Sequence, residues 1–261
     1  MIITTAPGHS DSRWKQAKQL AAELSAPVVP RRGLSVRKLM DMSEDGRVII
    51  VTDTETRYYD HPDEPPLYFH PSMAFIRVKR LRKGEGDPLL AVSRCEPGDR
   101  VIDCTAGMAA DSLVFSYGVG ETGQVVALES EPVLCALVRE GLSRYQSGLA
   151  DVDAAMRSIQ LLNENHADYL AAQPDNSADI VYFDPMFRQP IMESAAIGAF
   201  RSLANMDALT DSVIAEAKRV ARKTVVMKEN GRSEEFQRLG FAKSQWNTSK
   251  IAYGVIHIDR A

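Results

Sequence analysis

Several classes of protein are excluded by what this sequence has little of. It has only three cysteines, Cys95, Cys104 and Cys135, and none of them has the C-x-x-C spacing of a zinc or redox motif. A disulfide framework and a zinc cage are therefore not expected. No uncharged apolar run reaches the roughly 20 residues that a transmembrane helix needs. The first residues also lack the basic and apolar regions of a secretory signal, so we expect a cytoplasmic protein with no membrane partner.

The sequence also lacks an excess of positive charge. The net charge is −4, whereas a strongly basic balance is the usual indication of nucleic-acid binding. The charge is uneven, because residues 1–100 hold 16 basic and 14 acidic side chains and residues 101–261 hold 15 and 21. Any contact with nucleic acid must therefore come from a local patch. The five histidines have no metal-ligand spacing, so no metal site is predicted.

Short apolar runs alternate with amphipathic segments along most of the chain. The runs predict strands at 2–5, 27–30, 48–52, 101–104, 124–128, 159–162, 178–183 and 224–228, most of them separated by helical stretches. Residues 241–248 and 251–258 alternate and flank Ser249, which predicts a final antiparallel hairpin. Strands that alternate with helices favour an α/β fold with a doubly wound, mostly parallel sheet.

A change in composition marks a candidate domain boundary. Residues 60–66 contain three prolines, which is typical of a loop. We predict a small N-terminal α/β subdomain over residues 1–75 and a larger domain over residues 76–261. A basic run follows the boundary, and we predict that it contacts phosphates, with a solvated face as the alternative. Its members are Arg77, Lys79, Arg80, Arg82 and Lys83.

The first motif with chemical meaning is Val101-Ile-Asp-Cys-Thr-Ala-Gly107, followed by Asp111. A strand that ends in small residues lets a ligand approach the backbone, and the next helix offers free N–H groups. Glu129 ends the next predicted strand, 26 residues after Asp103, where an acidic side chain suits the hydroxyls of a ribose. The alternatives are a tight packing turn and a solvated residue at the start of a helix.

The most specific motif is Tyr182-Phe-Asp-Pro-Met-Phe187. An acidic side chain follows an apolar strand and is itself followed by proline and an aromatic residue. Asp184 and the carbonyl group of Pro185 can accept hydrogen bonds from an exocyclic amine, and Phe187 can stack on the base that carries it. The alternative is a strand end with a helix-capping aspartate and a core phenylalanine.

Taken together, these motifs resemble the class I S-adenosylmethionine-dependent methyltransferases, and more narrowly the RsmJ family of 16S ribosomal RNA guanine-N2 methyltransferases. The resemblance covers roughly residues 75 to 258. Its V-x-D-x-T-A-G-x-x-x-D pattern matches residues 101–111, its L-E matches Leu128 and Glu129, and its D-P-M-F matches residues 184–187. The chain departs from the family at Ala109 and Ala110, where a G-R pair is usual, and at Ala167 and Asp168, where the family has serines.

The resemblance implies a Rossmann-like, seven-stranded sheet that closes with the antiparallel hairpin. It implies S-adenosylmethionine as cofactor, S-adenosylhomocysteine as product, and ribosomal RNA or a small-subunit particle as partner. The cofactor is then expected to bind at Asp103, Thr105, Ala106, Gly107, Ala110, Asp111, Glu129, Ser130, Ala167 and Asp168. Asp184, Pro185 and Phe187 are expected to hold the target amine and base.

Three alternative functions remain open from the sequence. One is a methyltransferase of another amine, in adenine, protein or a small molecule. Another is a non-catalytic, cofactor-binding RNA or assembly factor. A dinucleotide-dependent oxidoreductase is disfavoured because no G-x-G-x-x-G turn follows the predicted strand at 101–104.

Overall fold

The computed structural model describes residues 1–185, 203, 207–244 and 251–258. They form two compact units. The first unit consists mainly of Met1–His70 and Glu131–Tyr145, and the second contains Pro71–Ser130 and most of the described chain after Gln146. The predicted boundary between residues 75 and 76 stays a prediction. Within the described part of the chain, no helix has the length and apolar character needed to cross a bilayer.

The first unit has a three-stranded sheet in the order β1-β2-β3. Strands β1 (Ile2–Thr5) and β2 (Val48–Val51) are parallel, and β3 (Thr56–Tyr59) pairs with β2 in the antiparallel sense. The run at residues 27–30 forms only a single bridge, from Val28 to Ile3. Its two prolines lack the N–H groups that a longer ladder needs, which explains why no strand forms there.

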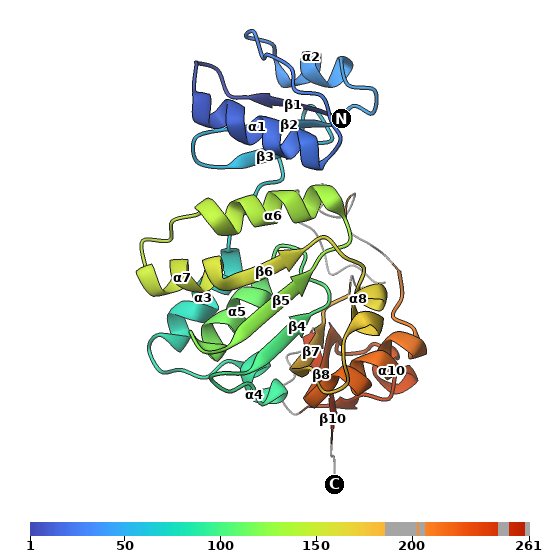
Figure 1. Ribbon diagram of the computed structural model, residues 1–261. Helices are drawn as coiled ribbons and strands as arrows, with labels where there is room; N and C mark the ends of the chain where they lie inside the picture. The colour runs from blue at the N-terminus through green and yellow to red at the C-terminus, as the bar shows by residue number, and fades with distance from the viewer. Residues whose placement is uncertain (186–202, 204–206, 245–250, 259–261) are drawn as a thin grey trace. The chain divides into compact units, whose positions relative to one another are not determined.

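The helices of the first unit are α1 (Asp11–Glu23), α2 (Val36–Asp41) and α6 (Pro132–Arg144). Ser10 and Ser35 cap α1 and α2, because each side chain accepts a hydrogen bond from a backbone N–H in the first helical turn. Helix α2 packs on one face of the sheet, where its Leu39 meets Val48 and Ile50 of β2. Helix α1 contacts β1 and β2. Figure 1 shows α1 and α2 at the N-terminal end of the colour scale and α6 in green.

The second unit contains the predicted sheet. Its strands are β4 (Arg100–Asp103), β5 (Gln124–Leu128), β6 (Ile159–Leu162), β7 (Ala178–Phe183), β8 (Ala221–Asn230), β9 (Ala242–Lys243) and β10 (Ile251–His257). They form a seven-stranded sheet in the order β6-β5-β4-β7-β8-β10-β9. The strands from β6 to β8 are parallel, and β10 is antiparallel to both β8 and β9. The predicted doubly wound fold and its final antiparallel hairpin are therefore confirmed.

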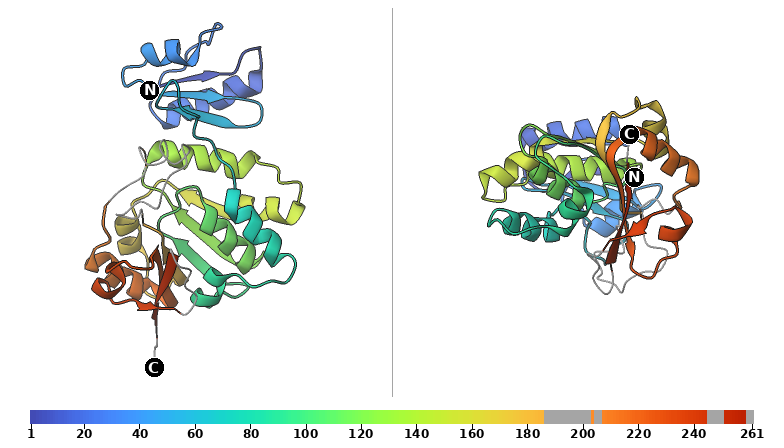
Figure 2. Two further views of the ribbon diagram at one scale, coloured as in Figure 1. Left: turned by 180° about the vertical axis from the view of Figure 1, so that it is seen from behind. Right: turned by 90° about the horizontal axis from the view of Figure 1, so that it is seen from below.

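Helices cover both faces of this sheet (Figures 1 and 2). The helices are α3 (Ser72–Leu81), α4 (Pro88–Ser93), α5 (Ala110–Val119), α7 (Ala150–Ser158), α8 (His166–Ala172), α10 (Asp211–Val220) and α11 (Glu235–Arg238). Leu89 of α4 and Phe115 of α5 pack with Val101 and Tyr182 on one face. Residues of α8, α10 and α11 pack with the alternate side chains on the other face. The strands are nearly continuous hydrophobic runs because both of their faces are buried.

Candidate functional site

The order of the strands indicates where the second sheet would bind a ligand. Strand β4 has β5 on one side and β7 on the other, so the direction of winding reverses there. In open α/β sheets, ligands bind at the carboxyl ends of the strands at such a reversal. Asp103 ends β4, while Glu129 directly follows β5 and Asp184 directly follows β7. The fold therefore brings these three predicted acidic residues to one edge of the sheet, which we call the acidic edge.

Asp103 organises the turn between β4 and α5. Its two carboxylate oxygens accept hydrogen bonds from the Thr105 N–H at 3.1 Å and from the Ser112 hydroxyl at 2.5 Å. The side chain is buried, and burial raises the pKa of Asp103 to about 7 even though both hydrogen bonds oppose this rise. Gly107 and Ala109 both have left-handed backbone, with φ of 50° and 56°. The buried side chain of Asp103 thus stabilises the conformation of the turn through its hydrogen bonds.

Glu129 faces the same turn from the end of β5. Its Oε2 accepts a hydrogen bond from the Gly107 N–H at 3.1 Å, and the residue is only 8% exposed. The side-chain amide of Asn163, which follows β6, donates to the Glu129 carbonyl oxygen at 2.8 Å. Ser130 follows and is partly buried. A carboxylate is thus held against a backbone turn of small residues.

The predicted residues after β6 begin helix α8. Asn165 caps this helix by accepting a hydrogen bond from the Ala167 N–H at 2.8 Å. Asp168 lies in the first helical turn and is exposed. The His166 ring packs edge-on against Phe183 of β7 with centroids 5.9 Å apart, and burial lowers the pKa of this histidine. The start of α8 therefore packs against β7, the strand that precedes Asp184.

Asp184 is tied to the turn after β4 and to a lysine. Its N–H donates to Thr105 Oγ1 at 2.5 Å, and Lys228 Nζ donates to its Oδ2 at 2.6 Å. Burial raises the pKa of Asp184 to about 6, Lys228 opposes this rise, and the negative charge of Asp111 adds to it. Pro185 is partly buried beside it, whereas Phe187, the predicted stacking residue, lies outside the described residues.

Lys228 is the site residue that the sequence analysis missed. Its ammonium group lies between two carboxylates, because it also donates to Asp111 Oδ2 at 2.8 Å. Strands β7 and β8 pair Phe183 with Met227, so the next residue of each strand, Asp184 and Lys228, are neighbours. The sequence signal was a lysine near the end of an apolar strand, which gains meaning only once the register is known.

Asp111 was predicted to contact a cofactor, and the structure gives it three partners within the protein. The Arg77 guanidinium and Lys228 form ion pairs with it, and the Tyr182 hydroxyl donates to its Oδ2 at 2.7 Å. Burial alone would raise the pKa of Asp111, but Lys228 and Arg77 hold it well below its usual range. The predicted contact with a cofactor stays a prediction.

The predicted basic run lies on α3 and just after it, and its side chains differ in their surroundings. Arg77 binds Asp87 at 2.7 Å as well as Asp111, so its charge is used inside the unit. Arg80 pairs with Glu85 at 2.7 Å and Arg82 with Asp151 at 2.6 Å. Lys79, Arg80, Arg82 and Lys83 are exposed. These four residues, without Arg77, define what we call the basic face.

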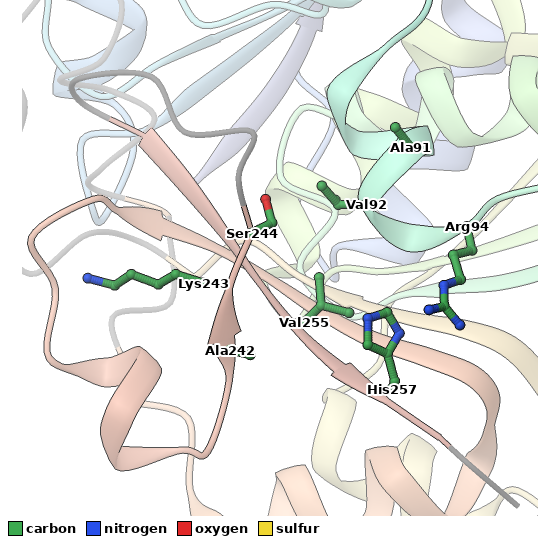
Figure 3. Close-up of a pocket in the computed structure, with 8 residues that line it drawn as sticks. All are labelled: Ala91, Val92, Arg94, Ala242, Lys243, Ser244, Val255 and His257. Atoms are coloured by element: carbon green, nitrogen blue, oxygen red, sulfur yellow. The ribbon is translucent and has the colours of Figure 1, made fainter.

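A surface cavity of about 300 Å³ lies elsewhere in the second unit (Figure 3). It is lined by α4, the following Arg94, β9 and β10, with Val255 in its wall. Arg94 and His257 lie near each other in Figure 3, whereas Lys243 points away from them. His257 pairs with Thr224, four residues before Lys228 on β8, so the cavity is at the amino end of that strand and not at the acidic edge.

Comparison with known proteins agrees with this geometry. A family described as "Putative SAM-dependent methyltransferase" matches residues 50–250. The chain is 38% identical over 255 residues to the uncharacterized protein YpiP of Bacillus subtilis, covering 98% of both chains. It is 35% identical over 206 residues to ribosomal RNA small subunit methyltransferase J of Salmonella schwarzengrund, covering 75% of this chain and 79% of that protein.

The fold is also found among solved structures. A SAM-dependent methyltransferase from Neisseria gonorrhoeae superimposes with a TM-score of 0.67 at 20% identity, covering 100% of this chain and 97% of that one. The chain belongs to the family of class I S-adenosylmethionine-dependent methyltransferases, within which it resembles the RsmJ proteins. S-adenosylmethionine is its cofactor. The acidic edge fits this molecule, because Glu129 offers a buried carboxylate beside a turn of small residues.

Proposed function

We propose that this protein transfers a methyl group to an exocyclic amine of ribosomal RNA, with N2 of guanine as the target. The observation that carries the proposal is the position of Asp184. Its backbone is hydrogen-bonded to the turn that follows β4, and its carboxylate lies at the same edge as Glu129. An acceptor for amine hydrogens therefore stands beside the predicted cofactor turn.

The proposal assigns cofactor binding to the predicted residues around that turn. Backbone atoms of Thr105, Ala106 and Gly107 would hold the methionine end, and Ala110 begins α5, whose free N–H groups would face the carboxylate of the cofactor. Glu129 and Ser130 would bind the ribose, and the start of α8 at Ala167 and Asp168 would hold the adenine. In this assignment Asp103 acts by shaping the turn, since both of its oxygens already accept hydrogen bonds within it.

The target amine would be held by two acceptors. The Asp184 carboxylate and the Pro185 carbonyl group would accept its two hydrogens, which orients the nitrogen lone pair and favours a pyramidal nitrogen. When bound, the cofactor would supply a methyl group on a sulfonium sulfur, which would keep the electron pair of the broken C–S bond. The nitrogen would form the new N–C bond with its lone pair and give up one proton to water. Phe187 would stack on the base, and a base in structured RNA must first leave its stack.

Two observations support RNA as the substrate. The relative from Salmonella schwarzengrund is named a ribosomal RNA small subunit methyltransferase. The basic face also supplies four exposed cations beside one another in sequence, and such side chains bind phosphates without reading bases. A ribosomal substrate in turn implies a location in the cytoplasm.

The test is transfer of labelled methyl from S-adenosylmethionine to 16S ribosomal RNA and to small subunits from cells that lack this gene. We expect the label in N2-methylguanosine with the natural protein. Asp184→Ala should reduce transfer by at least about a hundredfold, because the amine loses its charged acceptor. Asp211→Ala removes an exposed carboxylate of α10 and should transfer at the natural rate.

Each other outcome has a distinct meaning. Label in adenine, protein or a small molecule would refute the guanine target while leaving the reaction class. Cofactor binding by calorimetry with no transfer to any of these would indicate a binding-only protein. Full transfer by Asp184→Ala would remove the proposed role of this residue.

A further inference from the structure

Five side chains of alternating charge form a series of ion pairs that ends at Asp184. In order, its members are Asp87, Arg77, Asp111, Lys228 and Asp184. Arg77 contacts Asp87 with two nitrogens, at 2.7 and 2.8 Å, and Lys228 bridges Asp111 at 2.8 Å and Asp184 at 2.6 Å. The two ends of the series are carboxylates, and only the Asp184 end lies at the acidic edge.

Stability alone does not account for Lys228 in this position. The side chain is 19% exposed and its two carboxylate partners are both largely buried. Removing such charges from water costs about as much free energy as their pairing returns, so a buried ion pair is weak evidence of a stabilising role. Asp111 also already has a cationic partner in Arg77. The contact between Lys228 and Asp184 therefore calls for a different explanation.

We infer that Lys228 is a positioning residue for methyl transfer, which holds the Asp184 carboxylate ionised and in one orientation for the amine. This inference rests on the function proposed above. By binding Oδ2, the ammonium group fixes the plane of the carboxylate and directs its remaining acceptor capacity to a substrate N–H. Asp111 holds the lysine in turn, and its own position is fixed by Arg77.

Other titratable groups lie near Lys228 and Asp184 and affect the ionisation of Asp184. The Tyr182 hydroxyl donates to Asp111, and Tyr253 of β10 lies opposite Lys228 in the strand register. Burial raises the pKa of Tyr253 to about 12, so it stays neutral. Asp103 of β4 adds negative charge when ionised. Among the described residues, Lys228 alone forms an ion pair with the Asp184 carboxylate.

The sharpest test measures the ionisation of Asp184 without any substrate. The carboxyl resonance of Asp184 in ¹³C-aspartate-labelled protein is assigned by its loss in Asp184→Asn and followed against pH. The natural protein should titrate at about pH 6. In Lys228→Met the midpoint should rise by about 1 to 3 pH units, because an adjacent positive charge is lost. Lys228→Arg should restore most of the shift.

The chain offers a matched control. Lys223, on the same strand, also bridges two carboxylates, with Glu96 at 2.7 Å and Asp99 at 2.8 Å. Lys223→Met should leave the Asp184 midpoint unchanged. Lys228→Gln tests the inference even if Lys228→Met does not fold, because it keeps a polar side chain, removes the positive charge and should also raise the midpoint. An unchanged midpoint in a folded Lys228→Met, or in a folded Lys228→Gln, would overturn the inference.

Kinetics then link ionisation to the reaction. At pH 7, Lys228→Met should lower kcat about tenfold with little change in cofactor affinity, and the loss should be recovered near pH 9 as Asp184 ionises. Equal loss at all pH values would contradict the inference. If ribosomal RNA accepts no methyl group but the midpoint moves as expected, the proposed substrate is wrong and the role of Lys228 stands for another amine.

Discussion

Each unit has a pair of parallel strands and a turn that leads from its first strand into a helix, but side chains of opposite charge bind the backbone of the two turns. In the first unit, a cation binds carbonyl groups of the turn after β1, because Arg13 donates to Pro7 O at 3.2 Å and to Gly8 O at 3.1 Å. In the second unit, the turn after β4 points the Gly107 N–H toward the Glu129 carboxylate. Arg13 is 7% exposed and also pairs with Asp53 at 3.3 Å.

The difference teaches that strand order alone does not make a site. In the first unit the buried side chain of Arg13 packs against the turn, so the carbonyl groups of Pro7 and Gly8 have a donor within the unit. The second unit gathers carboxylates at the carboxyl ends of its strands, where a ligand with hydroxyl and amine groups finds acceptors. Three predictions test this contrast.

The largest effect is expected from Glu129. Glu129→Ala should weaken binding of S-adenosylmethionine by about 30- to 100-fold, because the ribose hydroxyls would lose the buried carboxylate that we propose as their acceptor. Asp53→Ala removes the acidic residue that follows the second strand of the first unit and should leave this affinity unchanged. Isothermal titration calorimetry measures both. Equal affinities for the two variants would break the comparison.

Removal of Arg13 should have a smaller effect, and one confined to the first unit. Arg13→Met leaves two carbonyl groups without their donor and removes the ion pair with Asp53, so the local free energy of unfolding should fall by about 1.5–2 kcal/mol. Hydrogen exchange should become faster at β1 and β2 and stay the same at β4 and β5. Lys15→Met, an exposed change on the same helix, serves as control. Equal acceleration in both units would contradict the assignment.

The smallest effects concern the two left-handed turn positions. Gly8 has φ of 90° and Ala109 has φ of 56°, so a glycine and an alanine occupy similar backbone. Gly8→Ala should lower the free energy of unfolding by about 1–2 kcal/mol. Ala109→Gly should change it little or raise it by up to about 1 kcal/mol, since relief of strain offsets the added freedom of the unfolded chain. Urea denaturation measures the free energy of unfolding of each variant. Ala110→Gly, a change in the first turn of α5, is the control that should be destabilised.

Much of the fold was predictable because its local signals agree with its tertiary structure. The runs at 124–128 and 178–183 become β5 and β7 with the predicted bounds, since both are apolar and end at turn residues. The helical nature of the basic run was not predicted, because Arg77 and Lys79 obscure its apolar face, and α7 was also missed. Asp184 stood out from its own motif, whereas Lys228 required the register between strands 44 residues apart in the chain.

Helix α6 has a consequence for how the chain is made. It follows β5 in sequence, yet it belongs to the first unit, where Arg144 donates to Asp53 O at 2.6 Å and a Cβ on Gly141 would lie 2.1 Å from Phe69. During synthesis, the strands of the N-terminal sheet therefore all leave the ribosome long before α6. The contacts between α6 and the rest of the first unit can form only after β4 and β5 have also been synthesised. The two units therefore do not fold one after the other during translation.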